Sequence, residues 1–337
     1  MAQQLLFHDF SKNLQKISEI GDGLERLNCV IDWSIFRKLL KKIRNNKTGA
    51  GGRPAFDEIV MFKALILQQL YELSDDQVEF QIRDRLSFMR FLGIQSFAEI
   101  PDSKTIWVFR EKLTEKNLVK KLFDLFLKAL EAQGFNATKG HIIDATIVNT
   151  PRQRNSREEN QQIKDGKVPE DWNKNPSKLA QKDTDARWLK KNGEKFFGYK
   201  NHVVADVKGK LIRDYSVTPA SVHDSQAAPD LLSRIPKGDK IYGDSAYHSD
   251  DISDVINSRK LIPKICSKGK RGTPLTPGQM KKNRKISKLR SRIEHIFGRM
   301  TQMGNICVRT IGKERATTCI GLQNLVYNMD RFAFLMR

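Results

Sequence analysis

The first part of the chain repeats apolar residues every three or four positions, which is the spacing of an amphipathic helix. Ile31, Ile35, Leu39 and Ile43 follow one another at four-residue steps and predict a helix over 30–44. The same criterion, together with cap residues such as Ser74, predicts further helices over 55–73, 75–93, 103–113 and 118–133. We therefore expect an all-α region up to about residue 135.

The pattern changes after that point to short runs of β-branched and apolar residues, which are typical of strands. Strands are predicted over 141–148, 198–206, 211–217, 240–244 and 261–266, with helices over 249–260 and 276–300. Lys208-Gly209 suits the hairpin turn between the second and third strands. Three strands followed by alternating helices and strands predict an α/β fold with a mixed five-stranded sheet.

These patterns divide the chain into three parts. A helical leader ending in a basic, Gly-rich loop is expected over 1–52, a helical domain over 53–135 and the α/β domain over 138–337. Within the α/β domain, residues 149–195 form a polar insert between the first two strands. We expect this insert to be a long loop, mobile or ordered by a ligand.

The charge of the chain narrows the choice of partner. Sixty Lys and Arg residues stand against 39 Asp and Glu, which gives a formal net charge of +21. Such an excess is self-repulsive unless a polyanion lies nearby, so nucleic acid is the first candidate partner and an anionic membrane surface the second. DNA is favoured because no basic helix with a rich apolar face stands out.

Other features exclude whole classes of protein. No apolar run approaches the length of a membrane span, and the N-terminus lacks the basic and apolar regions of a signal peptide. The four cysteines are scattered and form no CxxC pair, which favours reduced thiols over a zinc cluster. A cytoplasmic protein is the simplest expectation.

Three acidic residues stand out against this basic background. Asp144 lies inside the first predicted strand, and Asp244 ends the fourth, at the strand end where α/β sheets bind ligands. Glu294 is the only carboxylate between Asp254 and Glu314, in a segment dense in Lys and Arg. Three hard oxygen ligands suit Mg²⁺ or Mn²⁺, and two such ions could promote phosphodiester chemistry.

Each acid also has an ordinary explanation. Asp144 could be a paired strand residue, Asp244 could cap the helix that follows its strand, and Glu294 could form a salt bridge with Arg290 one helical turn earlier. A single metal site explains all three acids at once, whereas the ordinary account needs three separate coincidences.

The same residues resemble a known family. The element order, with Asp, Asp and Glu at these places, resembles the RNase H-like DDE transposases, and more narrowly the IS5 group of the IS4-like bacterial insertion-sequence transposases. The matching segments are "IDATIV", "FFGYKNHVVAD", "PASVHDSQ", "GDSAY" and "RSRIEHIFG", and residues 53–113 look like the group's N-terminal transposase domain.

The resemblance implies a function and a set of site residues. Asp144, Asp244 and Glu294 match the catalytic and metal-binding triad, with two Mg²⁺ or Mn²⁺ ions expected. In the family's signature around the Glu, Arg290 matches, but Ser287 replaces a Tyr and Thr301 replaces a Lys, so Arg292 and Arg299 are candidates to substitute. The protein is expected to bind the terminal inverted repeats of its element as a homodimer, cleave the ends and join the 3′-OH to target DNA at the bacterial nucleoid.

Some assignments remain open. Lys200, His202, Arg83 and Arg85 are further candidates to contact DNA, although a core hydrogen bond is as good an explanation for His202. Asp183 and Asp185 are expected to be surface acids. Two other functions fit the same residues: a metal-dependent RNase H-like nuclease acting in repair, and a DNA-binding regulator that does not cleave.

Overall fold

The structure is a computed structural model that describes residues 12–43, 55–269, 272–304 and 307–337. The chain separates into two compact units: unit 1 comprises Met1–Ala129 and Leu325–Arg337, and unit 2 comprises Leu130–Asn324. The predicted basic, Gly-rich loop over 45–54 lies entirely outside the described residues. Unit 1 thus includes a C-terminal segment that is distant in sequence from the rest of it.

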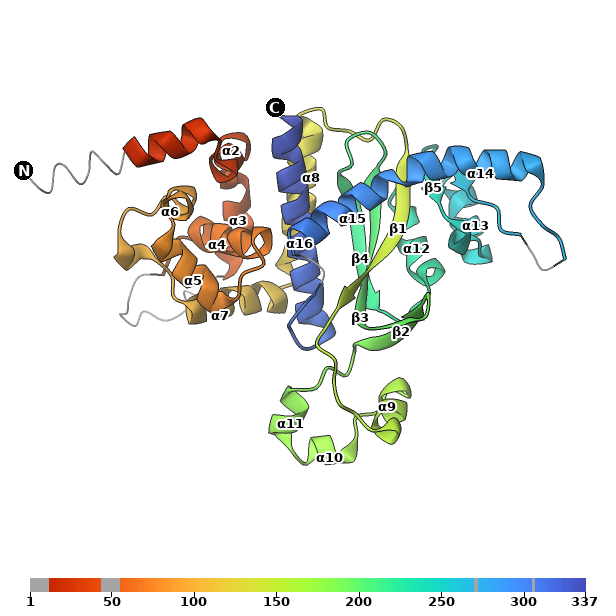
Figure 1. Cartoon of the computed structure of the whole chain (residues 1–337), viewed down its shortest axis with the longest axis horizontal. Helices are drawn as coiled ribbons and strands as arrows, with labels where there is room; N and C mark the ends of the chain where they lie inside the picture. Colours follow the sequence, from red (N-terminus) through yellow and green to blue (C-terminus); the bar gives the residue numbers. More distant parts are fainter. Residues whose placement is uncertain (1–11, 44–54, 270–271, 305–306) are drawn as a thin grey trace, which may run out of the picture. The chain divides into compact units, whose positions relative to one another are not determined.

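Unit 1 is built from helices, as the apolar spacing predicts (Figure 1). Its core gathers aromatic rings from four segments: Trp33 and Phe36, Phe62, Phe91, and Phe126 lie with neighbouring ring centroids 5.0 to 6.3 Å apart. Its elements are α2 (Gly23–Val30), η1 (Trp33–Phe36), α3 (Arg37–Leu40), η2 (Lys41–Ile43), α4 (Glu58–Leu70), α5 (Asp75–Asp84), α6 (Leu86–Leu92), η3 (Phe97–Glu99), α7 (Ser103–Glu115) and most of α8 (Leu118–Ala132).

Two of the predicted helices of unit 1 are interrupted. The segment over 30–44 forms three short helical pieces rather than one helix. The predicted helix over 75–93 breaks at Arg85, whose backbone is extended, with φ −109° and ψ 118°. The predicted cap is confirmed, since the Ser74 side chain accepts from the Gln77 N–H in a capping box that starts α5.

Unit 2 is built around a mixed sheet, and the predicted element order is confirmed. The sheet runs β2–β3–β1–β5–β6, and β4 also pairs with β3. It has six strands, so the prediction of five is short by one, because β2 forms inside the supposed loop. The strands are β1 (His141–Asn149), β2 (Arg187–Lys191), β3 (Glu194–Asp206), β4 (Ile212–Pro219), β5 (Lys240–Gly243) and β6 (Ile262–Ile265).

Helices pack against both faces of this sheet. Ile143 of β1 and Val204 of β3 lie opposite each other and join a buried cluster with Leu231 of α12 (Asp224–Ser233) and Ile252 of α13 (Asp250–Ser258). The opposite face meets α15 (Arg292–Gln302) and the first part of α16 (Lys313–Leu335), where Asn324 exchanges hydrogen bonds with Asn201. Successive residues of β1 therefore face different helices.

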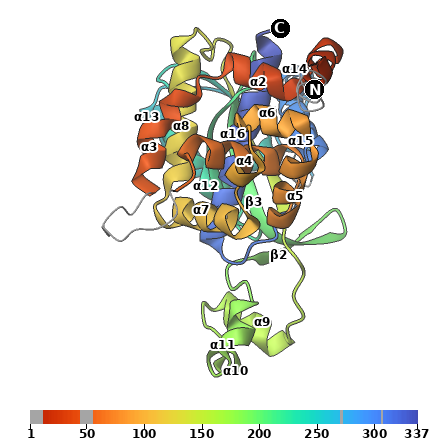
Figure 2. The ribbon, with the colours of Figure 1, turned by 90° about the vertical axis from the view of Figure 1, so that its left-hand side faces the viewer.

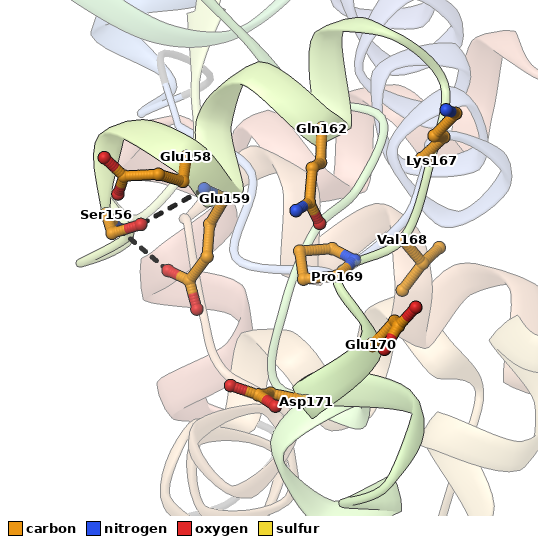
Figure 3. A pocket seen from close by; sticks show the side chains of 9 residues that line it. All are labelled: Ser156, Glu158, Glu159, Gln162, Lys167, Val168, Pro169, Glu170 and Asp171. Carbon is orange, nitrogen blue, oxygen red and sulfur yellow. Dashed lines mark hydrogen bonds between the residues drawn. The ribbon is translucent and has the colours of Figure 1, made fainter.

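The polar insert is folded rather than a plain loop. It contains α9 (Arg157–Lys164), α10 (Glu170–Asn173), α11 (Pro176–Ala180) and β2. Trp172 is fully buried, and its indole N–H donates to Glu159 at 2.7 Å. A cavity of about 940 Å³, lined by residues of α9, α10 and the loop between them that include the acids Glu158, Glu159, Glu170 and Asp171, lies within this insert (Figure 3). The expectation of an unstructured loop was wrong, because these helices are too short for apolar periodicity to reveal.

Among the described residues, no helix is both long enough and apolar enough to cross a membrane.

Candidate active site

Asp144 is held in the middle of the central strand. Its Cα pairs with that of Val203 on β3, and the adjacent Ile143 is buried. One carboxylate oxygen accepts the Ala145 N–H at 2.8 Å, and the other lies 3.6 Å from Nε of Arg290. The Asp144 side chain is 19% exposed, so it lies at the surface of the sheet with limited access to water.

Asp244 comes to the same level on the neighbouring strand. Strands β1 and β5 run parallel, with His141 opposite Ile241 and Ile142 opposite Tyr242. Continued by two residues, this register brings Asp244 beside Asp144. Asp244 also caps the short helix η4 (Ser245–Tyr247), accepting the Ala246 N–H at 2.8 Å. Asp244 thus caps a short helix that was not predicted, whereas Ser249 caps α13, the helix predicted after this strand.

The electrostatics of Asp144 show that acids gather here. Burial raises the pKa of Asp144, and the negative charges of Asp244 and Asp224 raise the pKa further. The Ala145 N–H and the Arg290 guanidinium act in the opposite direction and lower it. Clustered carboxylates of this kind are disfavoured unless a cation neutralises them.

Tyr247, three residues after Asp244, is buried near these acids. It is 2% exposed, and its hydroxyl oxygen has no hydrogen-bond partner among the described residues. Burial raises the pKa of Tyr247, and the charges of Asp144, Asp224 and Asp244 add to that rise. In the sequence, Tyr247 stands out only as part of the segment "GDSAY". The burial of its hydroxyl could not be predicted, because it depends on how η4 packs.

Glu294 does not join the two aspartates in this structure. The predicted long helix breaks at Ser291 into α14 (Pro277–Arg290) and α15, and Glu294 is exposed on α15. Arg290, expected to pair with Glu294, instead approaches Asp144. In the described parts of the chain, no three or more His, Cys, Asp or Glu side chains lie in a group that could hold a metal ion.

The aspartates themselves fit a divalent ion. Mg²⁺ is commonly bound through one or two carboxylates, with water and substrate phosphate at its other positions. Asp144 and Asp244 provide two carboxylates on adjacent strands, and burial, with the charge of Asp244, raises the pKa of Asp144. The residues present therefore fit such an ion without Glu294, which would have to turn inward to become a third ligand.

Asp224, within the segment "PASVHDSQ", is a further acid whose charge acts on Asp144. It begins α12, and its carboxylate accepts from Nζ of Lys200 at 2.9 Å. The same oxygen lies 4.0 Å from Nδ1 of His202. Asp224 follows β4 in the chain, and the pairing of β4 with β3 brings it close to the side chains of Lys200 and His202.

The basic residues predicted to contact DNA have varied surroundings. Lys200 and His202 are buried, with Lys200 donating to Val222 O and Asp224, and His202 bonded to Thr218 at 2.8 Å. Arg292 donates to Val207 O at 2.6 Å. The remaining candidates lie nearer the surface: Arg83 pairs with Glu79, Arg85 stacks on Phe88, and Arg299 is exposed on α15.

Asp183 is buried, so the expectation of a surface acid was wrong. It is 3% exposed and accepts hydrogen bonds from the Asp185, Ala186 and Gly312 N–H groups and from the Tyr199 hydroxyl. Burial raises the pKa of Tyr199, and the negative charge of Asp183 raises it further. Asp183 therefore ties the insert to β3 and to the start of α16.

Comparison with known proteins places this geometry in a family. Residues 137–329 match the model described as "Transposase DDE domain", and residues 12–112 match "Transposase domain (DUF772)". The transposase for insertion sequence element IS1106 of Neisseria meningitidis serogroup B is 33% identical over 194 residues. That match covers 56% of this chain and 64% of the relative, so the likeness extends over somewhat less than two thirds of that protein.

Solved structures show more distant similarity. A piggyBac transposase synaptic complex with hairpin DNA aligns with a TM-score of 0.45 and 13% identity, over 91% of this chain and 74% of that one. A Mos1 transposase paired-end complex aligns with a TM-score of 0.20 and 10% identity, over 65% and 62%. The family match rests on sequence: the first model covers more than half of the chain. This chain belongs to the family of the transposase DDE domain.

Proposed function

We propose that the chain is a DNA transposase of the insertion-sequence type, which cleaves the ends of its element and joins them to target DNA. The observation that carries the proposal is the parallel register of β1 and β5 in a member of this family. Continued by two residues, it brings Asp144 in the middle of β1 beside Asp244 at the end of β5. The net charge of +21 supports a polyanionic substrate. The segments quoted above support placement in the IS5 group.

Within this proposal, Asp144 and Asp244 hold divalent metal, for which Mg²⁺ is the expected ion. Bound there, the metal would supply the Lewis acidity that activates water or a 3′-OH and stabilises the leaving oxygen. Arg290 lies next to Asp144 and would balance negative charge from substrate phosphate. Glu294 completes the triad if its side chain turns toward β1, the strand that α15 contacts.

The expected partners follow from the chemistry. The substrates are double-stranded DNA at the inverted repeats of the element and at the target site, and the two ends call for a homodimer. We expect the chain to act at the bacterial nucleoid, as the identity of its Neisseria relative suggests.

The test compares two Asp→Asn variants of the full chain on a plasmid that carries the DNA flanking the gene. Asp244→Asn should bind this DNA normally in a gel-shift assay but nick it at least about a hundredfold more slowly with Mg²⁺. Asp251→Asn, an exposed residue in the first turn of α13, is the matched control and should nick normally.

Other results separate the competing functions. If Asp244→Asn nicks the DNA as fast as the wild type does, the proposed site is wrong. Cleavage without any need for the element ends would indicate a repair nuclease. DNA binding that ignores divalent metal, with no cleavage by the wild type, would indicate a regulator.

A further inference from the structure

The β2–β3 hairpin carries a surface that the catalytic cluster does not use. Its turn is Asn192-Gly193, with φ of 51° and 86°, the positive values that a tight two-residue hairpin turn requires. Strands β2 and β3 pair from Arg187 opposite Gly198 to Lys191 opposite Glu194. Figure 2 shows the strand β2 near the outer end of the sheet. Strand β2 and the hairpin turn lie within the insert that was expected to be a loop, and β3 continues beyond it.

One face of this hairpin combines aromatic rings with cations. Trp188 lies opposite Phe197, with ring centroids 5.1 Å apart, and Lys190 lies opposite Lys195. The guanidinium of Arg152 lies 5.9 Å from the centroid of the Trp188 ring, and Arg152 donates to the Lys195 carbonyl at 3.2 Å. Four of these side chains are exposed, and Trp188 remains 39% exposed despite its size.

The charges on this face are not arranged for stability. Two lysines directly opposite each other across a strand pair repel. The other face of the same hairpin shows the contrasting arrangement, since Lys191 lies opposite Glu194. In the part of the chain that the structure describes, none of Arg152, Lys190 and Lys195 forms an ion pair with an acid. A face that accepts repulsion and leaves a tryptophan exposed is suited to an anionic partner.

The same side of β3 leads toward Asp144, although Tyr199, Asn201 and Val203 are buried there and the exposed surface is confined to the hairpin. Side chains alternate along β3, so Phe197, Tyr199, Asn201 and Val203 share one face, and Val203 lies opposite Asp144. Lys195 and Val203 are eight residues apart along one strand, a separation of about 26 Å. That is less than the roughly 34 Å of one DNA helical turn.

We propose that Arg152, Trp188, Lys190 and Lys195 form a docking surface for the phosphate backbone of double-stranded DNA on the same sheet face as Asp144. Lys190 and Lys195 contact phosphates, and the Trp188 ring holds the Arg152 guanidinium in position for a further phosphate contact. The proposal rests on the proposed function and deepens it by naming where the substrate duplex is held.

The test measures binding of the full chain to a fluorescently labelled DNA duplex by anisotropy, in EDTA, over a series of KCl concentrations. Replacing a phosphate-contacting cation lowers the slope of log K against log [salt] by about one. We expect this change for Lys190→Gln and for Lys195→Gln. Lys191→Gln, on the opposite face of the same strand, is the control and should leave the slope unchanged.

Folding is checked on the same variants. Because Lys190 and Lys195 repel each other, Lys190→Gln should keep or raise the Tm while it weakens DNA binding. A loss of binding that follows a fall in Tm would overturn the proposal.

The role of the tryptophan has its own test. Trp188→Phe keeps a ring under Arg152 and should bind DNA nearly as the wild type does. Trp188→Leu should weaken binding about as much as Arg152→Gln, and the double variant should be no weaker than either single one, because both changes remove the same contact. Fully additive losses would overturn the link between the two residues.

These outcomes are separable from the proposed function, because no cleavage is involved. Unchanged salt slopes in both lysine variants would overturn the docking surface even if Asp244→Asn abolishes nicking. Reduced slopes would support it even if the wild type proves unable to nick DNA.

Discussion

Asp144 occupies a place where its charge is disfavoured by the protein around it. Burial and two neighbouring carboxylates raise its pKa, and the single nearby guanidinium offsets this only in part. Natural proteins accept such local instability where function requires it. At the residue scale, the divalent ion proposed for this site would relieve that electrostatic cost.

Asp144→Asn should therefore abolish nicking and, in EDTA, raise the Tm. The neutral amide removes the repulsion from Asp244 and Asp224 while keeping the side-chain shape. Adding Mg²⁺ should raise the Tm of the wild type and leave that of the variant nearly unchanged, because bound metal stabilises only the chain that can hold it. Differential scanning fluorimetry gives both numbers. A lower Tm for the variant in EDTA would contradict this account of the cluster.

Lys63 in unit 1 is a second buried charge, and its effect depends on pH. Its Nζ donates to Phe91 O at 2.9 Å and lies 4.9 Å from the centroid of the Trp33 ring. Burial lowers the pKa of Lys63 from 10.5 to about 8. Between these values the unfolded chain binds a proton that the folded chain has released, so folding is favoured increasingly as pH rises.

The comparison of Lys63→Met with the wild type tests this direction of the pH dependence of stability. Methionine carries no proton, so any stability advantage of the variant should be greatest at pH 7 and shrink as the pH rises through 8 toward 10. Urea unfolding of both chains at each pH measures the difference. A difference that stays constant over this range would show that Lys63 does not titrate as its surroundings indicate.

At the scale of elements, the spacing of apolar residues predicted secondary structure well wherever an element was long and buried on one face. The helices α4, α7 and α8 of unit 1 and the strands β1, β3, β4, β5 and β6 follow from apolar spacing. The helix breaks at Arg85 and Ser291 do not, because both residues sit within unbroken apolar patterns and tertiary packing decides their backbone angles. Arg290, the last residue before the second break, is the residue that approaches Asp144.

The insert shows why other features of the fold could not be predicted from the sequence. Its helices α10 and α11 have four and five residues, too few to show a period. Asp183 could not be recognised as buried, because one of its partners is the Gly312 N–H, 129 positions away in the chain. Such contacts leave no local pattern in the sequence.

Asp183→Ala should lower the free energy of unfolding by about 3 kcal/mol, because several buried donors lose their acceptor together. Tyr199→Phe removes one of these hydrogen bonds and should lower it by about 1 kcal/mol. Urea denaturation of unit 2 measures both, with the exposed Asp171→Ala as the control. Equal effects for Asp183→Ala and Asp171→Ala would contradict the anchoring role.

At the scale of the whole molecule, the division into units does not follow the order of the chain. Residues 325–337 belong with the helices of unit 1, although unit 2 separates them in sequence. Phe332, 1% exposed, meets Phe126 with ring centroids 6.1 Å apart. The helix α16 thus contributes its first part to one core and its second part to the other.

Phe332→Ala should lower the stability of unit 1 by about 3–5 kcal/mol, the usual effect of removing a buried aromatic ring. Hydrogen exchange followed by mass spectrometry should show faster exchange in α4 and α8, with little change in β1 and β3. Phe334→Ala, at a position that is 51% exposed, is the matched control. Faster exchange confined to the sheet would contradict the assignment of this segment to unit 1.

The position of residues 325–337 also has a consequence for biosynthesis. Unit 1 cannot complete its core when residue 129 leaves the ribosome, because its remaining helix segment is made about 200 residues later. At 5–20 residues per second, the delay is roughly 10–40 s. During that interval the apolar residues that Phe332 and its neighbours later cover are open to solvent, so the nascent chain is a natural client for chaperones.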